Sequence, residues 1–195
     1  MIMVNSKYVD LLKDEYKKSY LLYEKGSLKL EAWSSHQPVL IHVLNTIKTG
    51  DVLEFGTGYN STPIMHIICA FQQRKLLSIE TDKKWIEKSL KWRNINHIIE
   101  LVSSKELLEH TLFKHKFSIA FIDGAPAEIR QPFLEKVQAD YLIVHDTECV
   151  VRGIKNVYAY DFSMFKHVHH FKKDSTMTTL LSNLDEIDKN LLTIF

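Results

Sequence analysis

Four short apolar runs, separated by segments of helical periodicity, constrain the fold of this chain more than any other feature. The runs cover residues 51–55, 75–80, 117–123 and 141–146, and a weaker fifth run covers 98–102. Because apolar and polar residues do not alternate within them, we expect strands that are buried on both faces. Helical patterns fill 61–73, 82–93, 104–115 and 127–138. This alternation predicts a parallel sheet covered on both faces by helices.

The C-terminal part of the sequence has a different pattern. Two β-prone runs, 167–171 and 176–181, are separated only by 172–175 and are too close for a parallel crossover, so they predict an antiparallel hairpin. At the other end, 5–32 and 37–48 have helical patterns. We therefore expect an α/β fold of the Rossmann-like, doubly wound kind over 1–195, in one domain. In it, 1–48 form a cap or an edge and 49–195 form the sheet core.

Composition narrows the classes of partner. The chain has 25 Lys and Arg against 24 Asp and Glu. A protein that binds nucleic acid or an anionic membrane usually has a strong basic excess, so this near balance argues against both kinds of partner. The apolar start is too short for a signal peptide, and no apolar run approaches membrane-spanning length. Cys69 and Cys149 each lie in an apolar run, which is typical of buried free thiols. These observations predict a soluble, cytoplasmic protein that binds neither nucleic acid nor a membrane.

Polar clusters follow four of the predicted strands, at 54–61, 80–82, 123–126 and 145–148. In an open parallel sheet, ligands bind outside the carboxyl ends of the strands. We therefore expect these four clusters, which are far apart in the sequence, to meet in one ligand site.

The first two clusters suggest an adenosine cofactor. Gly56 and Gly58 allow a tight turn and a close approach of a ligand to the backbone before a helix start. Glu80 ends the next strand, where a carboxylate can accept hydrogen bonds from ribose hydroxyls. The alternatives for Glu80 are a solvated strand-end carboxylate or a neighbour of a helix N-cap. A nicotinamide dinucleotide would want a third glycine where Ser61 stands, and Glu54 would repel its pyrophosphate. A ligand that carries an ammonium and a sulfonium suits Glu54 better.

Four motifs in order, Glu54-Phe-Gly-Thr-Gly-Tyr59, Leu77-Ser-Ile-Glu80, Ile122-Asp-Gly124 and Val144-His-Asp146, resemble the class I S-adenosylmethionine-dependent methyltransferases. Within that superfamily the last two motifs are similar to small-molecule O-methyltransferases. The resemblance implies a seven-stranded sheet with an antiparallel last strand and S-adenosylmethionine as cofactor. It assigns cofactor binding to Glu54, Gly56, Thr57, Gly58, Asn60, Glu80, Ser104 and Asp123, with Glu80 at the ribose, Ser104 near the adenine and Asp123 beside the transferable methyl group.

A hydroxyl acceptor must lose a proton, so the site needs a general base or a metal ion. Asp123, His145 and Asp146 are the catalytic candidates. In one version Asp123 and Asp146 bind Mg²⁺, although Thr147 stands where metal-dependent relatives have Asp or Asn. In the other, His145 or Asp146 takes the proton directly. Both residues also have non-catalytic interpretations. His145 could be a core histidine bonded to a backbone carbonyl, and Asp146 could be a helix cap or a structural carboxylate.

Several further residues have simpler interpretations. We expect Ser35 to cap the helix at 37–48, with the alternative that 33–36 folds over the cofactor. Arg130 is expected in a surface salt bridge, with binding of an anionic substrate as the alternative. A solvated strand is expected for His167, His169 and His170, and core packing on one helix for Trp85 and Trp92. Aromatic residues of the segment 147–166 either line a substrate pocket or pack a homodimer interface; they are Tyr158, Tyr160, Phe162 and Phe165.

The leading functional hypothesis is therefore an S-adenosylmethionine-dependent methyltransferase that acts on oxygen of a small molecule. Two hypotheses from other classes stay open at this point. One is an NAD(P)-dependent oxidoreductase, and the other is a binding module that uses the cofactor fold without catalysis.

Overall fold

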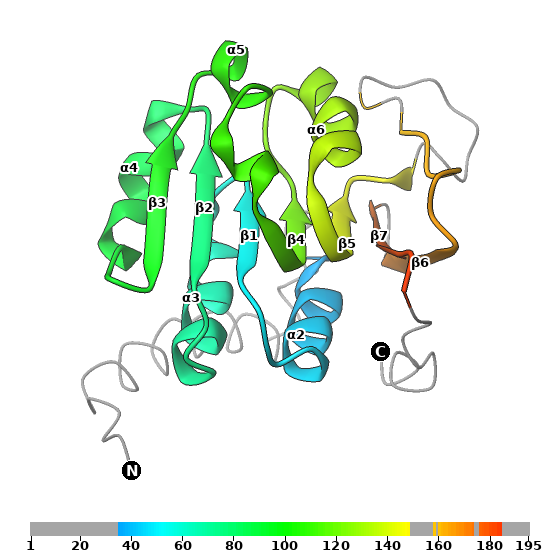
Figure 1. The fold of residues 1–195 in the computed structure, drawn as a ribbon, viewed down its shortest axis with the longest axis horizontal. Helices are drawn as coiled ribbons and strands as arrows, with labels where there is room; N and C mark the ends of the chain where they lie inside the picture. Colours follow the sequence, from blue (N-terminus) through cyan, green and yellow to red (C-terminus); the bar gives the residue numbers. More distant parts are fainter. Residues whose placement is uncertain (1–34, 149–157, 159, 174–175, 185–195) are drawn as a thin grey trace.

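A computed structural model describes residues 35–148, 158, 160–173 and 176–184. The predicted helix at 5–32, Trp33 and Cys149 lie outside these residues. A seven-stranded sheet in the order β3-β2-β1-β4-β5-β7-β6 forms the centre of the molecule (Figure 1). The strands are β1 (Val52–Phe55), β2 (Leu76–Glu80), β3 (His97–Leu101), β4 (Lys116–Ile122), β5 (Gln138–His145), β6 (His167–Lys173) and β7 (Thr176–Ser182).

Strands β1 to β5 are parallel, and β7 runs antiparallel between β5 and β6. The register pairs Val144 of β5 with Thr179 of β7, and Thr179 in turn with His170 of β6. The predicted α/β class, the seven strands and the C-terminal antiparallel hairpin are confirmed. Strand order reverses between β1 and β4, which is where an open parallel sheet binds its ligand.

The helices are shorter than their sequence patterns. They are α2 (Gln37–Thr46), α3 (Thr62–Phe71), α4 (Lys83–Ser89), α5 (Ser104–Leu107) and α6 (Arg130–Lys136), with 3₁₀ turns η2 (Leu90–Trp92), η3 (Thr111–Lys114) and η4 (Ala127–Ile129). The expected helix at 104–115 is wrong in its second half. His110 takes an extended conformation there, and its ring nitrogen accepts a hydrogen bond from the Leu112 N–H, which starts the separate turn η3.

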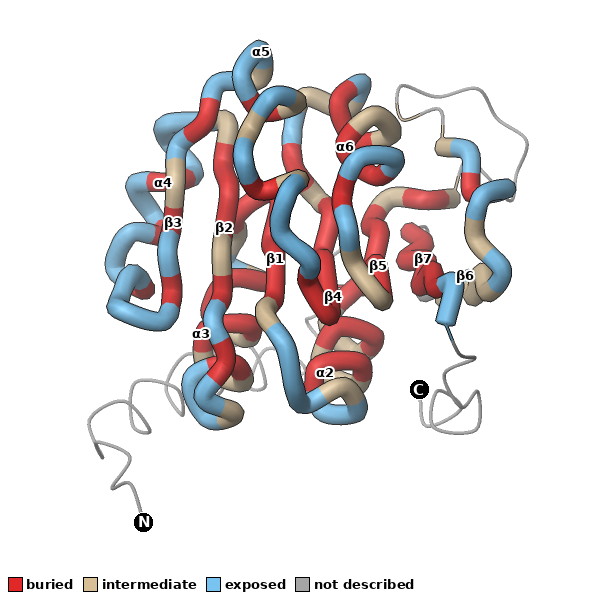
Figure 2. Tube along the Cα trace, in the orientation of Figure 1, coloured by how far each residue is buried: buried red, intermediate tan, exposed pale blue. Residues whose placement is uncertain are grey.

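Two buried clusters show that helices cover both faces of the sheet. One contains Leu40 of α2 and Met65 of α3 together with Val52 of β1. The other contains Leu107 of α5 and Phe133 of α6 together with Leu53, the next residue of β1. Neighbouring residues of a strand point to opposite faces, so both faces of β1 are packed. Figure 2 shows the central strands almost wholly buried. Each fully buried side chain of this kind contributes roughly 1.5–3 kcal/mol.

The two tryptophans do not share a buried face. Trp92 is buried, but 39% of Trp85 is exposed, so core packing is wrong for Trp85. The reason is that α4 ends at Ser89 and η2 follows, which breaks the helical period that would bring residues seven apart onto one face. Cys69 is a buried free thiol, as expected, and burial raises its pKa to about 12. No helix among the described residues combines the length and the apolar character needed to cross a membrane.

Candidate functional site

The loop after β1 turns against the tip of β4. Gly56 has a φ of +94°, and a Cβ atom there would lie 2.5 Å from the backbone N and Cα of Gly124. Only glycine fits both the conformation and the contact. A Cβ at Gly58, in contrast, would meet nothing nearer than the Ser61 hydroxyl at 3.7 Å. The two predicted cofactor glycines therefore differ, since Gly56 joins two strand ends and Gly58 leaves open space.

Glu80 holds this loop to the end of β2. Its Oε2 atom accepts hydrogen bonds from the Thr57 backbone N–H at 2.7 Å and from the Thr57 hydroxyl at 3.1 Å. Its Oε1 atom accepts from the backbone N–H groups of Thr81 and Asp82. Glu80 is buried, so the alternative of a solvated strand-end carboxylate is wrong. One of its four donors is a hydroxyl, the same kind of donor that a ribose offers.

Glu54 supports the loop from beneath. Its side chain has no exposed surface, and its two oxygens accept hydrogen bonds from the hydroxyls of Thr62, at 2.9 Å, and Ser78, at 2.6 Å. The Gly58 N–H donates in turn to the Thr62 hydroxyl. Burial raises the pKa of Glu54 to about 7, against the lowering effect of these hydrogen bonds. In this structure Glu54 therefore shapes the loop, and the expected contact with a cofactor ammonium would need a route through this buried position.

Two buried histidines extend the Glu54 network. His97 Nε2 lies 2.8 Å from the Ser78 hydroxyl oxygen, and His97 Nδ1 lies 2.9 Å from His66 Nδ1. Since Ser78 donates to Glu54, His97 donates to Ser78 and its Nδ1 is left to accept from His66. Burial and the neighbouring His66 lower the pKa of His97 to about 3. This series of hydrogen bonds cannot be predicted from the sequence, because His66 and His97 lie in separate elements and no motif surrounds either residue.

Asp123, His145 and Asp146 meet at the tips of β4 and β5. His145 is buried; its Nδ1 lies 3.2 Å from Asp123 Oδ1 and 3.5 Å from Asp146 Oδ1. Its Nε2 lies 3.0 Å from the Ser35 hydroxyl oxygen. Both ring nitrogens thus have side-chain partners, and the alternative of a core histidine bonded to a backbone carbonyl is wrong.

The charges of this group are coupled. Burial lowers the pKa of His145, but the hydrogen bond that His145 donates to Asp123 and the negative charges of Asp123 and Asp146 outweigh burial, so the pKa is raised overall. Burial raises the pKa of Asp123, but His145 and Arg130 outweigh it and the pKa is lowered. Asp123 is therefore an ionised acceptor that orients the His145 ring through Nδ1–H.

Ser35 and His36 lie at the start of α2, next to the end of β5. The Ser35 hydroxyl also accepts from the Thr176 hydroxyl of β7 at 2.7 Å. The predicted helix cap is wrong: His36 occupies the N-cap position of α2, and no side chain makes a capping bond there. The His36 and His145 rings meet edge to face at 4.7 Å. Burial and His145 lower the pKa of His36 to about 4, so it is neutral at pH 7.

Arg130 is buried at the centre of the site, so the expected surface salt bridge is wrong. Its Nη2 donates to Asp123 Oδ1 at 3.0 Å, and its Nη1 to Asp146 Oδ2 at 3.3 Å. The Tyr158 ring lies against the guanidinium at 4.5 Å. This position of Arg130 cannot be predicted from the sequence, because it depends on contacts between the start of α6 and the ends of β4 and β5.

Asp146 has an unusual backbone conformation, with a φ of +58°. This left-handed conformation is uncommon outside glycine, although Asp tolerates it better than most residues. Asp146 Oδ2 also accepts a hydrogen bond from the Tyr158 hydroxyl at 3.2 Å. The alternative of a helix cap is thus wrong for Asp146, whose carboxylate instead binds Arg130 and Tyr158.

The aromatic residues of the 147–166 segment gather at the edge of this group. The rings of Tyr158 and Tyr160 stack at 5.7 Å, and those of Tyr160 and Phe162 at 5.4 Å. Phe162 is buried in the core, and Tyr160 donates to the His145 carbonyl oxygen. Tyr158 and Tyr160 therefore border the site. The substrate pocket and the homodimer interface both stay predictions.

The Asp123 and Asp146 pair does not fit Mg²⁺ as the structure arranges it. Arg130 already bonds an oxygen of each carboxylate. His36, Asp123 and His145 also offer ligand atoms that lie within 4.8 Å of one another. Asp123 Oδ1, however, already accepts from Arg130 and from the proton on His145 Nδ1. The described residues of the predicted histidine strand, His167, His169 and His170, are not among the metal-ligating groups found.

Ser104 and Asn60, for which cofactor contacts are predicted, follow the ends of β3 and β1. Ser104 opens α5 directly after β3, and β3 pairs with β2 so that Leu101 stands beside Glu80. The Asn60 carbonyl oxygen accepts from the Gln37 side chain at 3.0 Å and from His36 Nε2 at 3.3 Å, which ties the loop to α2. Adenine contact for Ser104 and cofactor contact for Asn60 stay predictions.

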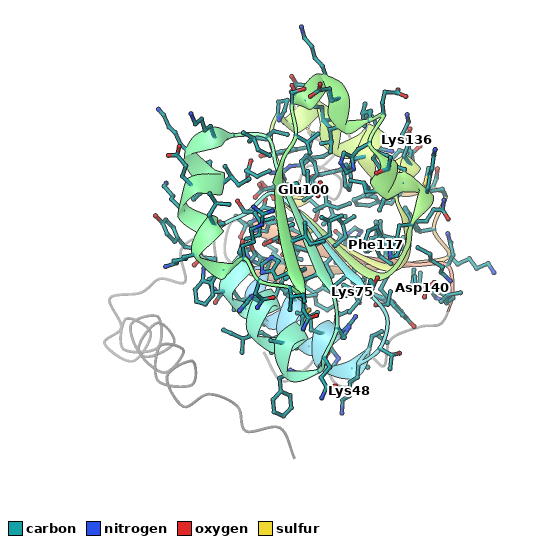
Figure 3. The ribbon with its side chains drawn as sticks, turned by 60° about the vertical axis from the view of Figure 1, so that its left-hand side comes forward. Lys48, Lys75, Glu100, Phe117, Lys136 and Asp140 are labelled. Atoms are coloured by element: carbon teal, nitrogen blue, oxygen red, sulfur yellow. The ribbon has the colours of Figure 1, made fainter. Side chains whose placement is uncertain are left out.

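A separate hollow of about 400 Å³ is lined by residues from 51–52, 75–77, 95–100 and 110–117. Lys75, Glu100 and Phe117 are among its lining residues (Figure 3). It holds none of the predicted site residues, so the candidate functional site is the group at the carboxyl ends of β1, β2, β4 and β5.

Comparison with known proteins shows similarity in structure only. No sequence family and no curated protein matches the chain. A provisionally assigned caffeoyl-CoA O-methyltransferase from Staphylococcus aureus has 18% identity and a TM-score of 0.56, with 90% of this chain and 98% of that chain covered. A provisionally assigned O-methyltransferase from Klebsiella pneumoniae has 14% identity and a TM-score of 0.55, over 93% and 92%.

Human methyltransferase-like protein 13, solved with S-adenosylhomocysteine, has 13% identity and a TM-score of 0.55, over 84% of each chain. These likenesses define the fold. The chain has the fold of the class I S-adenosylmethionine-dependent methyltransferases, as its four motifs imply.

Proposed function

We propose that this protein is an S-adenosylmethionine-dependent methyltransferase that methylates a hydroxyl oxygen of a small molecule, with His145 as general base. The arrangement of His145 carries the proposal. One ring nitrogen faces the ionised Asp123 carboxylate, and the other lies 3.0 Å from a hydroxyl oxygen, that of Ser35. A neutral imidazole held in this way can accept a proton from a hydroxyl group.

The residues of the first two strand ends fit a sulfur nucleoside. Gly56 and Gly58 place no side chain at two positions of the loop, and Glu80 Oε2 already accepts a hydroxyl hydrogen bond from Thr57. S-adenosylmethionine, when bound, supplies a methyl carbon activated by a sulfonium. Holding an acceptor in line with such a carbon is an orientation effect that can be worth roughly 7–11 kcal/mol.

In this mechanism Asp123 keeps the proton of His145 on Nδ1, so that Nε2 can receive the proton of the acceptor. Ser35 marks the position of a hydroxyl within reach of Nε2. Arg130 holds Asp123 and Asp146 in place through one oxygen of each. No step requires a metal ion.

Calorimetry with S-adenosylhomocysteine tests the cofactor half of the proposal. We expect saturable binding by the wild type and weaker binding by Glu80→Ala, with Glu87→Ala, on the exposed side of α4, as the control. Absence of binding by the folded wild type would refute the proposal. A radiolabelled S-adenosylmethionine assay across hydroxyl, amine and thiol acceptors tests the other half. Binding without turnover on any acceptor would favour the non-catalytic binding module.

A further inference from the structure

Arg130 lies between the two carboxylates that end β4 and β5. Its Nη2 is 3.0 Å from Asp123 Oδ1 and its Nη1 is 3.3 Å from Asp146 Oδ2. Only 6% of the Arg130 side chain is exposed, against 27% for Asp123 and 23% for Asp146. The guanidinium is therefore more deeply buried than either partner, which is unlike a surface ion pair.

Main-chain atoms fix the guanidinium in this place. Arg130 Nε donates to the Gly124 carbonyl oxygen at 2.6 Å, and Nη2 to the Asp123 carbonyl oxygen at 2.9 Å. Nη1 lies 3.3 Å from the His145 carbonyl oxygen. These acceptors belong to the ends of β4 and β5, so a change in side-chain rotamers at the site does not release Arg130. Its position is part of the fold.

The residue after Asp146 is also turned away from the site. Thr147 is fully buried, and its hydroxyl bonds the Met177 carbonyl oxygen at 3.2 Å and the Thr179 hydroxyl at 2.6 Å. Both partners lie on β7. The Thr147 hydroxyl is therefore bound to β7 and is not directed at Asp123 and Asp146, which is an observation independent of Arg130.

From these two observations we infer that the Arg130 guanidinium serves as the built-in cation of Asp123 and Asp146, and that the site excludes a divalent metal. A guanidinium can satisfy two carboxylates through separate N–H groups. A divalent cation at the same oxygens would be repelled by its charge at close range in a largely buried site. The exclusion of metal stands without the proposed function, whereas metal-free methyl transfer to a hydroxyl rests on it.

Cation binding can be measured directly with Tb³⁺, whose luminescence nearby tyrosines such as Tyr158 sensitise, and with Mg²⁺ as competitor. For the wild type we expect no saturable signal that Mg²⁺ displaces. For Arg130→Met we expect a gain in Tb³⁺ affinity of about tenfold or more, because two carboxylates lose their counter-charge. The gain should vanish in Arg130→Met with Asp146→Asn. The matched control is Arg130→Lys, which keeps the positive charge and should show no gain.

Wild-type binding of Mg²⁺, Mn²⁺ or Zn²⁺ that is lost in Asp123→Asn or Asp146→Asn would overturn the inference. So would a folded Arg130→Met, with native near-UV circular dichroism, that gains no cation affinity. If Arg130→Met does not fold, the wild-type and Arg130→Lys titrations still decide. None of these measurements uses methyl transfer, so failure to bind S-adenosylhomocysteine would contradict the proposed function and leave the cation result standing. In the activity assay, a chelator should leave the rate unchanged.

Discussion

The His145 Nε2 atom and the Ser35 hydroxyl oxygen lie 3.0 Å apart, while Asp123 bonds the opposite nitrogen of the same ring. Ser35 precedes α2 and His145 ends β5, so the contact joins the start of the described chain to the centre of the sheet. It places a hydroxyl at the nitrogen that we assign as the base.

Removing the base should slow methyl transfer without weakening cofactor binding. We expect His145→Asn to lower kcat by about 10²–10⁴-fold, the usual contribution of general base catalysis. Calorimetry with S-adenosylhomocysteine should give an affinity close to that of the wild type. An exposed histidine offers the matched control, His170→Asn, which should retain its rate. A rate for His145→Asn equal to that of the wild type would show that another group takes the proton.

The rate should depend on pH through His145. Only the neutral imidazole can accept a proton, and the pKa of His145 is raised above its ordinary value of 6.5. We therefore expect kcat/KM to rise with pH through a midpoint above 6.5. Asp123→Asn removes the main raising influence, so NMR titration of the His145 ring in that variant should give a lower pKa. The assignment fails if the His145 pKa does not move.

Glu54 should make stability depend on pH. Its pKa is raised in the folded protein from 4.5 to about 7, so its favourable contribution is full below pH 4.5 and is lost as the pH rises through 7. Glu54→Gln does not titrate. We expect its free energy of unfolding to improve relative to the wild type between pH 5 and pH 8, by at most about 1.4 kcal/mol per pH unit. Urea titrations at both pH values measure this; Glu87→Gln, on the exposed side of α4, should show no such trend.

The two loop glycines should respond differently to alanine. Gly56→Ala forces a side chain into a φ of +94° and against Gly124, and such backbone strain alone costs about 1–3 kcal/mol. Gly58→Ala meets open space and should fold normally. Chemical denaturation compares the two. Equal stability of the variants would mean that the loop can rearrange around Gly56.

The sheet could be predicted from the sequence because its evidence is local. The apolar composition of a run such as 117–123 by itself predicts a buried strand. The observed strand, β4, covers Lys116–Ile122. The resemblance likewise led to the site through Glu80, Asp123 and His145, since the carboxyl ends of parallel strands must meet. What failed was the length of helices, as at 104–115, where the extended conformation of His110 interrupts a helical pattern that is otherwise continuous.

The rest of the site depends on tertiary packing. Arg130 looks like a surface residue in its helix, and only the closure of α6 over Gly124 and the His145 carbonyl oxygen buries it. His36 lies outside the four motifs in the sequence, and the position of α2 brings its ring next to that of His145. The buried pair His66 and His97 likewise comes from two elements. A single sequence shows such residues individually, and their partners appear only when the elements are assembled.

The backbone contact between Gly56 and Gly124 limits how a site with this architecture can change. The loop after β1 and the strand end that carries Asp123 are in contact with no side chain between them, so a shift of one would require a shift of the other. Under the proposed function, a different methyl acceptor would be accommodated by residues around the strand ends. Examples are Ser35 and His36 at the start of α2, and Tyr158 and Tyr160 beside Arg130. We therefore expect related sequences to vary at these surrounding residues and to keep the backbone contact between Gly56 and Gly124.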